Sequence, residues 1–505
     1  MRAPRHRRSR RRSVVRACAA AAAVLGPPSA AAAPDFAPCR IGSESATVRA
    51  ECATLAVALD PDAPDAGTID LAIARVRARG RDPAADPFVF VAGGPGQSAR
   101  EVWGGVAGAF ADVARERDVI LVDQRGTGGS SPLDCPEQET GDGTGGGTGV
   151  GTPAATPAAP EAEAAASRVC LAALEADPRL FTTSVAVADL ERVRAALGVE
   201  RWNLYGVSYG TRVAMHYARR HPARVRAMIL DAAVPPGTPL GADIARHAQR
   251  ALDDTFARCA AEPGCAAAFP DIAARARALI ASLAEAPRTV EFEDLASGRV
   301  RTEPFEREAL AATLRLLGYS AWGASLVPSM LDDAIRHDHF APLARQAAIQ
   351  AEALEATLAT GMHRAIVCTE DLPFVDVDAT ARAAEGTYLG PEPIRALAAA
   401  CAPWPRGRLD ADFHDPLELD VPTLVLSGGA DPVTPPEFGE RAIAGLARAR
   451  HLVNPGQGHM QAQLGCVPRL MARFVEAPDP EALATGCLER LAPPPFFVDA
   501  NGPLP

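Results

Sequence analysis

One serine lies in a sequence context that is typical of a catalytic nucleophile. The segment GVSYG at residues 206–210 places Ser208 in the pattern G-x-S-x-G, between a strand-like run at 202–205 and a helix-like run at 211–221. In this context the pattern predicts a sharp strand-to-helix turn that presents the serine hydroxyl at the edge of a sheet. The pattern alone is weak evidence in a chain with 42 glycines, so partner residues must support it.

Two further residues match the general base and the orienting acid that such a serine requires. Asp431 follows an apolar, strand-like run at 421–427, and His459 follows a second short run at 451–453. Catalytic groups in open, mostly parallel sheets gather beyond the carboxyl ends of the strands. We therefore expect Ser208, Asp431 and His459 to meet at one edge of a sheet as a catalytic triad.

Each of these residues also has a non-catalytic interpretation. Asp431 precedes a proline and could simply form a turn, His459 could be a loop histidine, and Ser208 could be a turn residue. The order serine, acid, histidine, with each residue after its own strand, favours catalysis.

A glycine-rich loop early in the chain matches an oxyanion hole. The apolar run FVFVA at 88–92 leads directly into GGPG at 93–96. Acyl transfer develops negative charge on the carbonyl oxygen, and backbone N–H groups stabilise that charge. We expect the two donors to be the amide of Tyr209, which follows the serine, and the amide of Gly94. The alternative is an ordinary glycine turn.

Six short segments share the pattern of one family, and they are distributed along nearly the whole chain after residue 33. They are AGGPG (92–96), DQRGTGGS (123–130), GVSYG (206–210), GMHRAIVCTEDLPF (361–374), ADPVTP (430–435) and GQGH (456–459). With them the chain resembles the proline iminopeptidase and tripeptidyl aminopeptidase branch of the α/β-hydrolases (peptidase S33), including secreted members with a TAP-like C-terminal region. One departure is Ala92, where many members carry histidine.

The resemblance implies a fold and an activity. The implied fold is an α/β-hydrolase: a mostly parallel eight-stranded sheet with helices on both faces, and a mainly helical cap inserted between strands 6 and 7. The implied activity is that of a serine exopeptidase acting at the N-terminus of a peptide. Such an enzyme needs a carboxylate to bind the free amine, because a buried ammonium group requires a partner. The family-like segment offers Glu370 and Asp371 for this role; the alternative is an exposed acidic pair at the start of a helix.

The strand and helix patterns divide the chain. We expect a signal peptide at 1–33, a first part of the hydrolase core at 34–236, a helical cap at 237–418 and a second, TAP-like part of the core at 419–505. Within the first part, 139–166 is a low-complexity segment that we interpret as a flexible insert. The expected strands are 54–59, 68–77, 88–92, 119–123, 202–205, 227–231, 421–427 and 451–453, and the clearest cap helices are 242–260, 272–284 and 341–359.

The first 33 residues have the features of an export signal. They contain eight arginines and no acidic residue, followed by an Ala-rich apolar run and small residues at 30–33. The segment RRSVV at 11–15 resembles a twin-arginine signal. The alternative is a basic tail that binds nucleic acid. Removal of this segment changes the formal net charge from −11 to −19, which disfavours nucleic-acid binding. We expect an exported protein, periplasmic or extracellular, with no stable membrane span after signal removal.

The sequence also excludes several classes of chemistry. It contains no lysine, which excludes a P-loop lysine, a Ser-Lys dyad and Schiff-base catalysis. It contains neither a CxxC nor an HExxH motif, so nothing in it argues for a metal. We expect no cofactor and no metal.

The cysteines suggest disulfide bonds. Ten of the eleven cysteines lie after the leader, an even number that fits an oxidising compartment. The alternative is that several remain buried free thiols. Nearest-neighbour spacing suggests the pairs Cys39–Cys52, Cys135–Cys170, Cys259–Cys265, Cys368–Cys401 and Cys466–Cys487.

Three functions remain open at this point. The first is a secreted serine aminopeptidase that releases an N-terminal proline or a short peptide. The second is a carboxylesterase that acts on small esters, which would be indifferent to a free amine. The third is a non-catalytic binding protein on a hydrolase scaffold. We expect a peptide or small acyl substrate and a monomer.

Overall fold

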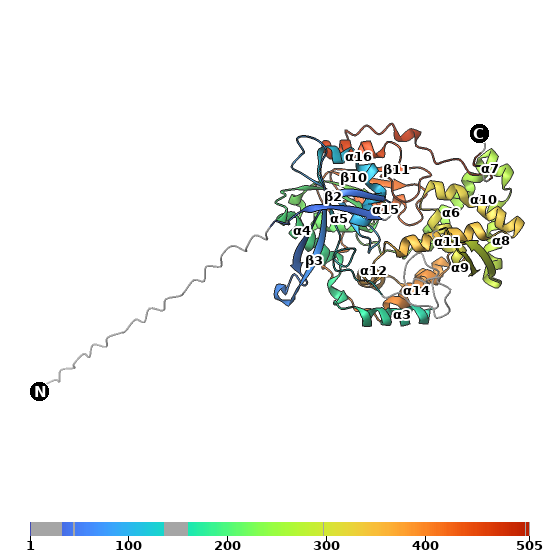
Figure 1. The fold of residues 1–505 in the computed structure, drawn as a ribbon, viewed down its shortest axis with the longest axis horizontal. Helices are drawn as coiled ribbons and strands as arrows, with labels where there is room; N and C mark the ends of the chain where they lie inside the picture. Colours follow the sequence, from blue (N-terminus) through green and yellow to red (C-terminus); the bar gives the residue numbers. More distant parts are fainter. Residues whose placement is uncertain (2–32, 44–45, 136–159, 296, 500, 504–505) are drawn as a thin grey trace. The chain divides into compact units, whose positions relative to one another are not determined.

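A mostly parallel sheet of nine strands forms the centre of residues 33–505 (Figure 1). The structure, a computed structural model, describes residues 1, 33–43, 46–135, 160–295, 297–499 and 501–503, so the expected leader lies outside the described residues apart from its ends. The strands are β1 (Ala37–Ser43), β2 (Ala46–Ala58), β3 (Thr68–Val76), β4 (Phe88–Val91), β5 (Val119–Val122), β6 (Trp202–Val207), β7 (Val225–Asp231), β10 (Thr423–Gly428) and β11 (Ala449–Asn454).

The strand order is β1-β2-β3-β5-β4-β6-β7-β10-β11. The pairs β1–β2, β2–β3 and β3–β5 are antiparallel, and the remaining neighbours are parallel. The fold class predicted from the resemblance is therefore present, with one more strand than the eight expected. The additional strand is β1, whose only fully buried residue is Ile41. Such a strand has no hydrophobic alternation from which to predict it.

The parallel strands are covered on both faces, because successive side chains of a strand point to opposite sides. Val89 and Val91 of β4 join one core, whereas Phe88 and Phe90 join the other. The first core includes α4 (Thr183–Ala196) and α5 (Tyr209–Arg220); the second includes α1 (Ala99–Val106) and α16 (Val467–Glu476). Burial on both sides explains why these strands are continuous apolar runs.

The segment 237–418, which we call the helical insert, leaves the sheet after β7 and returns to it at β10. It has a core of its own, which includes Leu310, Leu331 and Phe496. Its elements are α6 (Ile244–Ala261), α7 (Pro263–Ala268), α8 (Ile272–Glu285), the hairpin β8 (Arg288–Glu293) and β9 (Val300–Phe305), α9 (Arg307–Leu317), α10 (Ala321–His337), α11 (Ala341–Glu355), α12 (Thr360–Ile366), a π-helix (Val367–Asp371), α13 (Val377–Ala384) and α14 (Glu392–Cys401).

One local expectation needs correction. Residues 160–166, predicted to be part of a flexible insert, begin helix α3 (Pro160–Ala173), because an alanine-rich run with acidic residues in its first turn favours a helix. The remainder of that insert, residues 139–159, lies outside the described residues. In the C-terminal segment Phe496 is fully buried in the core of the helical insert.

The disulfide bonds follow the predicted pairing. Five bonds are present, and they fasten β1 to β2, α3 to the segment after β5, α6 to α7, the π-helix to α14, and the start of α16 to the C-terminal segment. The bonded pairs are Cys39–Cys52, Cys135–Cys170, Cys259–Cys265, Cys368–Cys401 and Cys466–Cys487. They are consistent with an oxidising compartment.

Candidate active site

Ser208 occupies a strained turn between β6 and α5. Its backbone angles are φ 54° and ψ −127°, which a non-glycine residue adopts only where the surrounding structure enforces them. The flanking glycines leave the necessary space: a Cβ on Gly210 would lie 2.6 Å from the Ala92 carbonyl oxygen, and one on Gly206 would lie 2.6 Å from the Gly210 carbonyl carbon. The local geometry is that of a nucleophile elbow.

The structure joins the predicted base and acid directly. His459 Nδ1 lies 2.8 Å from Asp431 Oδ2, and both side chains are almost completely buried. Because Nδ1 is used in this way, Nε2 is the nitrogen left for proton transfer. Among the described residues no hydrogen bond joins the Ser208 hydroxyl to His459, and such bonds are often long in unliganded enzymes.

The contact between Asp431 and His459 shifts the pKa values of both groups. Burial would by itself raise the pKa of the Asp431 carboxyl, but the charge of His459 and hydrogen bonds from His459 and Thr434 outweigh it and lower the pKa. Burial would likewise lower the pKa of His459, but the Asp431 carboxylate outweighs it and raises the pKa. The arrangement therefore favours a charged aspartate that stabilises an imidazolium, as a general base requires.

Thr434 completes the surroundings of Asp431, and the sequence analysis did not identify it. Its Oγ1 donates to Asp431 Oδ2 (2.7 Å) and lies 3.1 Å from His459 Nδ1. The backbone amides of Val433 and Thr434 donate to the other carboxylate oxygen, Oδ1. A threonine three residues after the acid in a D-P-x-T turn is the local signal that could have indicated this role.

A second buried carboxylate, Asp231 at the end of β7, links the serine turn to the histidine loop. Its backbone carbonyl accepts from the Ser208 amide (2.9 Å). Its carboxylate accepts from the Tyr205 hydroxyl and from the amides of Gln461 and Ala462, each at 2.8 Å. Burial raises the pKa of this carboxyl to about 6 against these hydrogen bonds. Asp231 thereby holds the residues just after His459 close to Ser208.

The two predicted oxyanion donors follow β4 and β6, which are neighbouring parallel strands of the sheet. Neither the Gly94 amide nor the Tyr209 amide donates to another residue in the described part of the chain. For Tyr209 this follows from its place at the start of α5, where backbone N–H groups have no partner within the helix. Gly94 has φ 103°, which favours glycine, and is followed by a cis bond to Pro95. Ser208 lies beside this loop, since a Cβ on Gly93 would be 3.2 Å from Ser208 Cβ.

Asp123, the first residue of the DQRG segment, stabilises the chain just after the glycine-rich loop. Asp123 is fully buried and accepts hydrogen bonds from the Ser98 hydroxyl (2.8 Å), from Arg100 and from the Gly129 amide. Ser98 in turn caps α1, directly after the glycine loop. The carboxylate therefore fixes the point at which the chain leaves the candidate oxyanion loop.

The helical insert also contacts the oxyanion loop. The Ala359 amide donates to the Gly96 carbonyl (3.0 Å), and Leu358 forms an isolated β-bridge with Gln97. His363 Nδ1 lies 3.3 Å from the Pro95 carbonyl, and burial lowers the pKa of this histidine to about 4. A neutral His363 can donate its Nδ1 proton to that carbonyl.

Glu370 and Asp371 are brought together at the end of the π-helix, and both are fully buried. Glu370 accepts from the Thr183 amide (2.7 Å) and hydroxyl (2.8 Å), and Asp371 accepts from Arg212 (2.7 Å) and from the Leu240 amide (2.7 Å). Neither is an exposed acid at a helix start. Burial raises the pKa of Glu370 to about 7, with Arg212 opposing this effect. These protein donors favour a structural role for both carboxylates.

No group of three or more His, Cys, Asp or Glu side chains in the described residues is arranged to hold a metal ion. None of the helices in this part of the chain is long and apolar enough to cross a membrane.

Comparison with known proteins gives consistent matches. The model of the family described as "alpha/beta hydrolase fold" matches residues 86–462. The chain is 32% identical over 255 residues to serine protease Hip1 of Mycobacterium tuberculosis, covering 46% of each chain. It is 30% identical over 200 residues to a tripeptidyl aminopeptidase of Streptomyces lividans (37% of this chain, 36% of the relative). It is 28% identical over 149 residues to a proline iminopeptidase of Neisseria gonorrhoeae (30% and 33%). The matched regions thus span at most about half the length of these relatives.

Proposed function

Because this chain belongs to the alpha/beta hydrolase fold family, we propose that it is an exported serine aminopeptidase that releases an N-terminal proline or a short peptide through an acyl-enzyme. The observation that carries the catalytic part is the buried hydrogen bond between His459 and Asp431 at the edge where Ser208 sits in its strained turn. The relatives, a tripeptidyl aminopeptidase and proline iminopeptidases among them, support the peptidase part.

The proposed reaction uses the protein's own groups throughout. Ser208 Oγ attacks the scissile carbonyl carbon while His459 Nε2 takes the hydroxyl proton. Asp431 holds the imidazole by Nδ1 and stabilises its charged form. The amides of Gly94 and Tyr209 bind the oxyanion. His459 then protonates the leaving amine, and water hydrolyses the acyl-enzyme by the same proton route.

Matched chromogenic substrates test this proposal. Pro-, Ala- and Ala-Ala-Pro-p-nitroanilide, each with a free and with a blocked N-terminus, are compared with p-nitrophenyl butyrate. An aminopeptidase cleaves only the free-amine anilides, and the preferred length gives the number of residues released. The Ser208→Ala variant should lose nearly all turnover while its circular dichroism spectrum stays unchanged; a folded variant that keeps substantial activity would exclude this serine.

The second candidate is a carboxylesterase acting on small esters. The same Ser208, Asp431 and His459 would serve it, because this chemistry is shared by esterases and peptidases. The observation in its favour is that both candidate amine-binding carboxylates are already bonded to protein donors. Cleavage of p-nitrophenyl butyrate with no cleavage of any anilide would establish it.

A role for Glu370 in amine binding has its own test. If Glu370 binds the substrate amine, Glu370→Gln raises KM for a free-amine anilide and leaves KM for the butyrate ester unchanged. If the carboxylate is purely structural, the two substrates respond alike and the thermal midpoint falls.

A further inference from the structure

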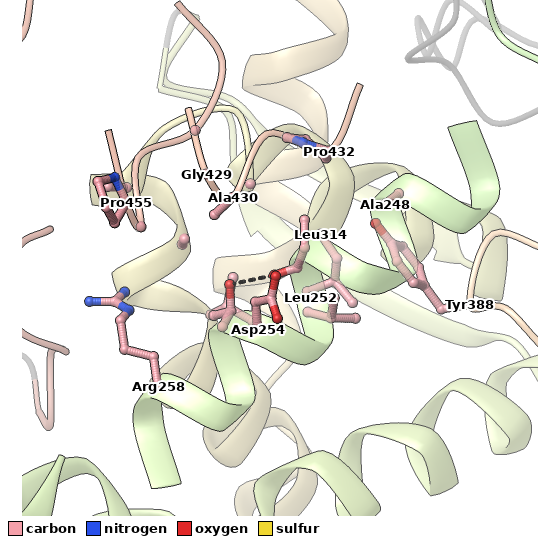
Figure 2. Close-up of a pocket in the computed structure, with 18 of the residues that line it drawn as sticks. Ala248, Leu252, Asp254, Arg258, Leu314, Tyr388, Gly429, Ala430, Pro432 and Pro455 are labelled. Carbon is pink, nitrogen blue, oxygen red and sulfur yellow. Dashed lines mark hydrogen bonds between the residues drawn. The ribbon is translucent and has the colours of Figure 1, made fainter. Parts of the chain in front are cut away.

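A cavity of about 350 Å³ lies beside the loops that carry the candidate catalytic acid and histidine, and Figure 2 shows residues that line it. It is bounded on one side by α6 and α10 of the helical insert. On the other side it is bounded by the loops that follow β10 and β11, which carry Asp431 and His459. Ser208, Gly94 and Tyr209 do not line it, so it is distinct from the candidate oxyanion site. Its lining includes Ala248, Ala251, Asp254, Arg258, Gly318, Ala321, Ala324 and Gly458.

Small side chains create this space. Ala248 and Ala251 are three residues apart on α6, and Ala321 and Ala324 are three residues apart on α10. Residues at this spacing share one face of a helix, so each helix presents a pair of alanines where larger side chains would fill the gap. The volume falls within the range of small-molecule sites, about 300–1,000 Å³, and such sites are mostly apolar with a few polar groups.

One carboxylate, that of Asp254, lines the cavity and is exposed to solvent. Among the described residues it has no hydrogen bond or ion pair, and burial raises its pKa although the charge of Arg250 opposes this shift. The neighbouring cations on α6 make their hydrogen bonds and ring contacts elsewhere. Arg250 pairs with Glu437, and Arg258 donates to the Pro494 carbonyl and stacks on the Phe496 ring. An incoming cation would therefore meet an exposed carboxylate that has no hydrogen-bonded protein partner.

Two glycines that line the cavity, Gly318 and Gly458, relate it to the candidate catalytic histidine. Gly318 and Gly458 immediately precede Tyr319 and His459, and the His459 amide donates to the Tyr319 carbonyl (2.8 Å). The Tyr319 ring also lies edge-on to the imidazole, with the ring centroids 5.0 Å apart. A molecule that contacts Gly318 and Gly458 therefore presses on the contact that positions His459.

We propose that this cavity is a second binding site for a small apolar molecule with a primary amine, which seats its apolar part between the alanines and its ammonium group on Asp254. Occupancy changes the position of His459 through Tyr319 and so changes the rate of the catalysed reaction. The binding part is independent of the proposed function. The effect on rate rests on it, because it requires His459 to be the base.

Binding is tested in the Ser208→Ala variant, so that turnover plays no part. The probes are n-hexylamine and, as the neutral match, n-hexanol, titrated by calorimetry. Hexylamine is expected to bind at least tenfold more tightly than hexanol. Asp254→Asn should remove this preference, whereas Asp253→Asn, on the adjacent carboxylate that does not line the cavity, should keep it. Equal binding of the two probes, or an unchanged preference in Asp254→Asn, would overturn the proposal.

A cavity-filling variant identifies the place of binding. Ala251→Leu and Ala324→Leu should each weaken hexylamine binding at least tenfold without lowering the thermal midpoint. Should either variant fail to fold, the other carries the test. Undiminished binding in both folded variants would place the amine elsewhere and contradict the assignment.

The effect on catalysis is measured separately with the unmodified Ser208 enzyme and p-nitrophenyl butyrate. Saturating hexylamine should change kcat at least twofold, and this change should vanish in Asp254→Asn and in Ala251→Leu. Binding without any change in kcat would overturn the regulatory part alone. A protein that binds hexylamine as expected but hydrolyses neither esters nor anilides would refute the proposed function and leave the binding site intact.

Discussion

The backbone amide of His459 donates a hydrogen bond to the carbonyl oxygen of Tyr319, 140 residues earlier in the chain (2.8 Å). Tyr319 belongs to the turn between α9 and α10 of the helical insert. A second bond, from Ala359 to Gly96, joins the insert to the candidate oxyanion loop. The insert therefore supports both loops on which the proposed chemistry depends, and displacement of the insert should impair catalysis as well as substrate binding.

Asp431→Asn tests the orienting acid. The amide keeps the shape of the side chain but cannot stabilise the imidazolium and favours the wrong tautomer of His459. We expect kcat to fall on the order of 10³–10⁴-fold with little change in KM. Steady-state kinetics with the preferred substrate would measure this, and Asp420→Asn, at an exposed surface carboxylate, serves as the control. A loss below tenfold would argue against the role of Asp431.

The pH dependence of kcat/KM should report His459. The base must be neutral, and the Asp431 carboxylate raises its pKa above the ordinary 6.5. Activity should therefore fall towards acid with a midpoint above 6.5, and in Asp431→Asn the midpoint of the residual activity should move to lower pH. An identical midpoint in both enzymes would contradict the coupling.

The same pair should affect stability in a defined pH window. The raised pKa of His459 stabilises the fold fully below the unfolded value of 6.5, and this contribution is lost as pH rises through the folded pKa. The lowered pKa of Asp431 stabilises the fold above 3.8, and this contribution is lost as pH falls through the folded pKa. Thermal midpoints of the unmodified protein and of His459→Gln should differ most between these limits. A difference that does not vary with pH would contradict this account.

Thr434→Val should lower kcat by roughly 10–100-fold, because it removes a hydrogen bond to a charged carboxylate without changing the shape of the side chain. Thr434→Ser is the matched control: it keeps the hydroxyl that donates to Asp431 and should retain most of the activity. If valine and serine behave alike, the hydroxyl does not position the Asp431–His459 pair.

Gly210→Ala should destabilise the protein by about 1–3 kcal/mol, because the added methyl group would overlap the backbone carbonyls of Val91 and Ala92. Gly105→Ala is the control, since beyond its chain neighbours and the nearby backbone of its own helix no atom lies within 4 Å of an added Cβ there, and alanine favours the helix. Urea denaturation of both variants would compare them. Equal free energies of unfolding would show that the close packing of the turn is not required.

Arg212→Met should destabilise the fold by about 3–5 kcal/mol, because it leaves the buried Asp371 carboxylate without its ion-pair partner. The double variant Arg212→Met with Asp371→Asn should recover part of this loss. Thermal and urea denaturation would measure both. An undiminished stability in the single variant would mean that water or another donor replaces the arginine.

Several features could be predicted from sequence because they depend on near neighbours in the chain. Apolar runs that end in polar loops predicted eight of the nine strands of the sheet, and the cysteine spacing predicted the five disulfide bonds of the described residues. The resemblance to the proline iminopeptidase and tripeptidyl aminopeptidase branch is confirmed by the family match and the relatives. Catalysis by Ser208, Asp431 and His459 stays a prediction, to which the structure adds geometry that supports it.

Other features were decided only by tertiary structure, because they join residues far apart in sequence whose types have many possible partners. The amides of Gln461 and Ala462, which follow β11, meet Asp231 at the end of β7 because β10 pairs with both of these strands in the sheet. The carboxylates of Glu370 and Asp371 are buried against Thr183 and Arg212 because packing places the π-helix there. No periodicity or spacing encodes such contacts. They form because a polar side chain that becomes buried on folding needs a hydrogen-bonding partner within the folded chain.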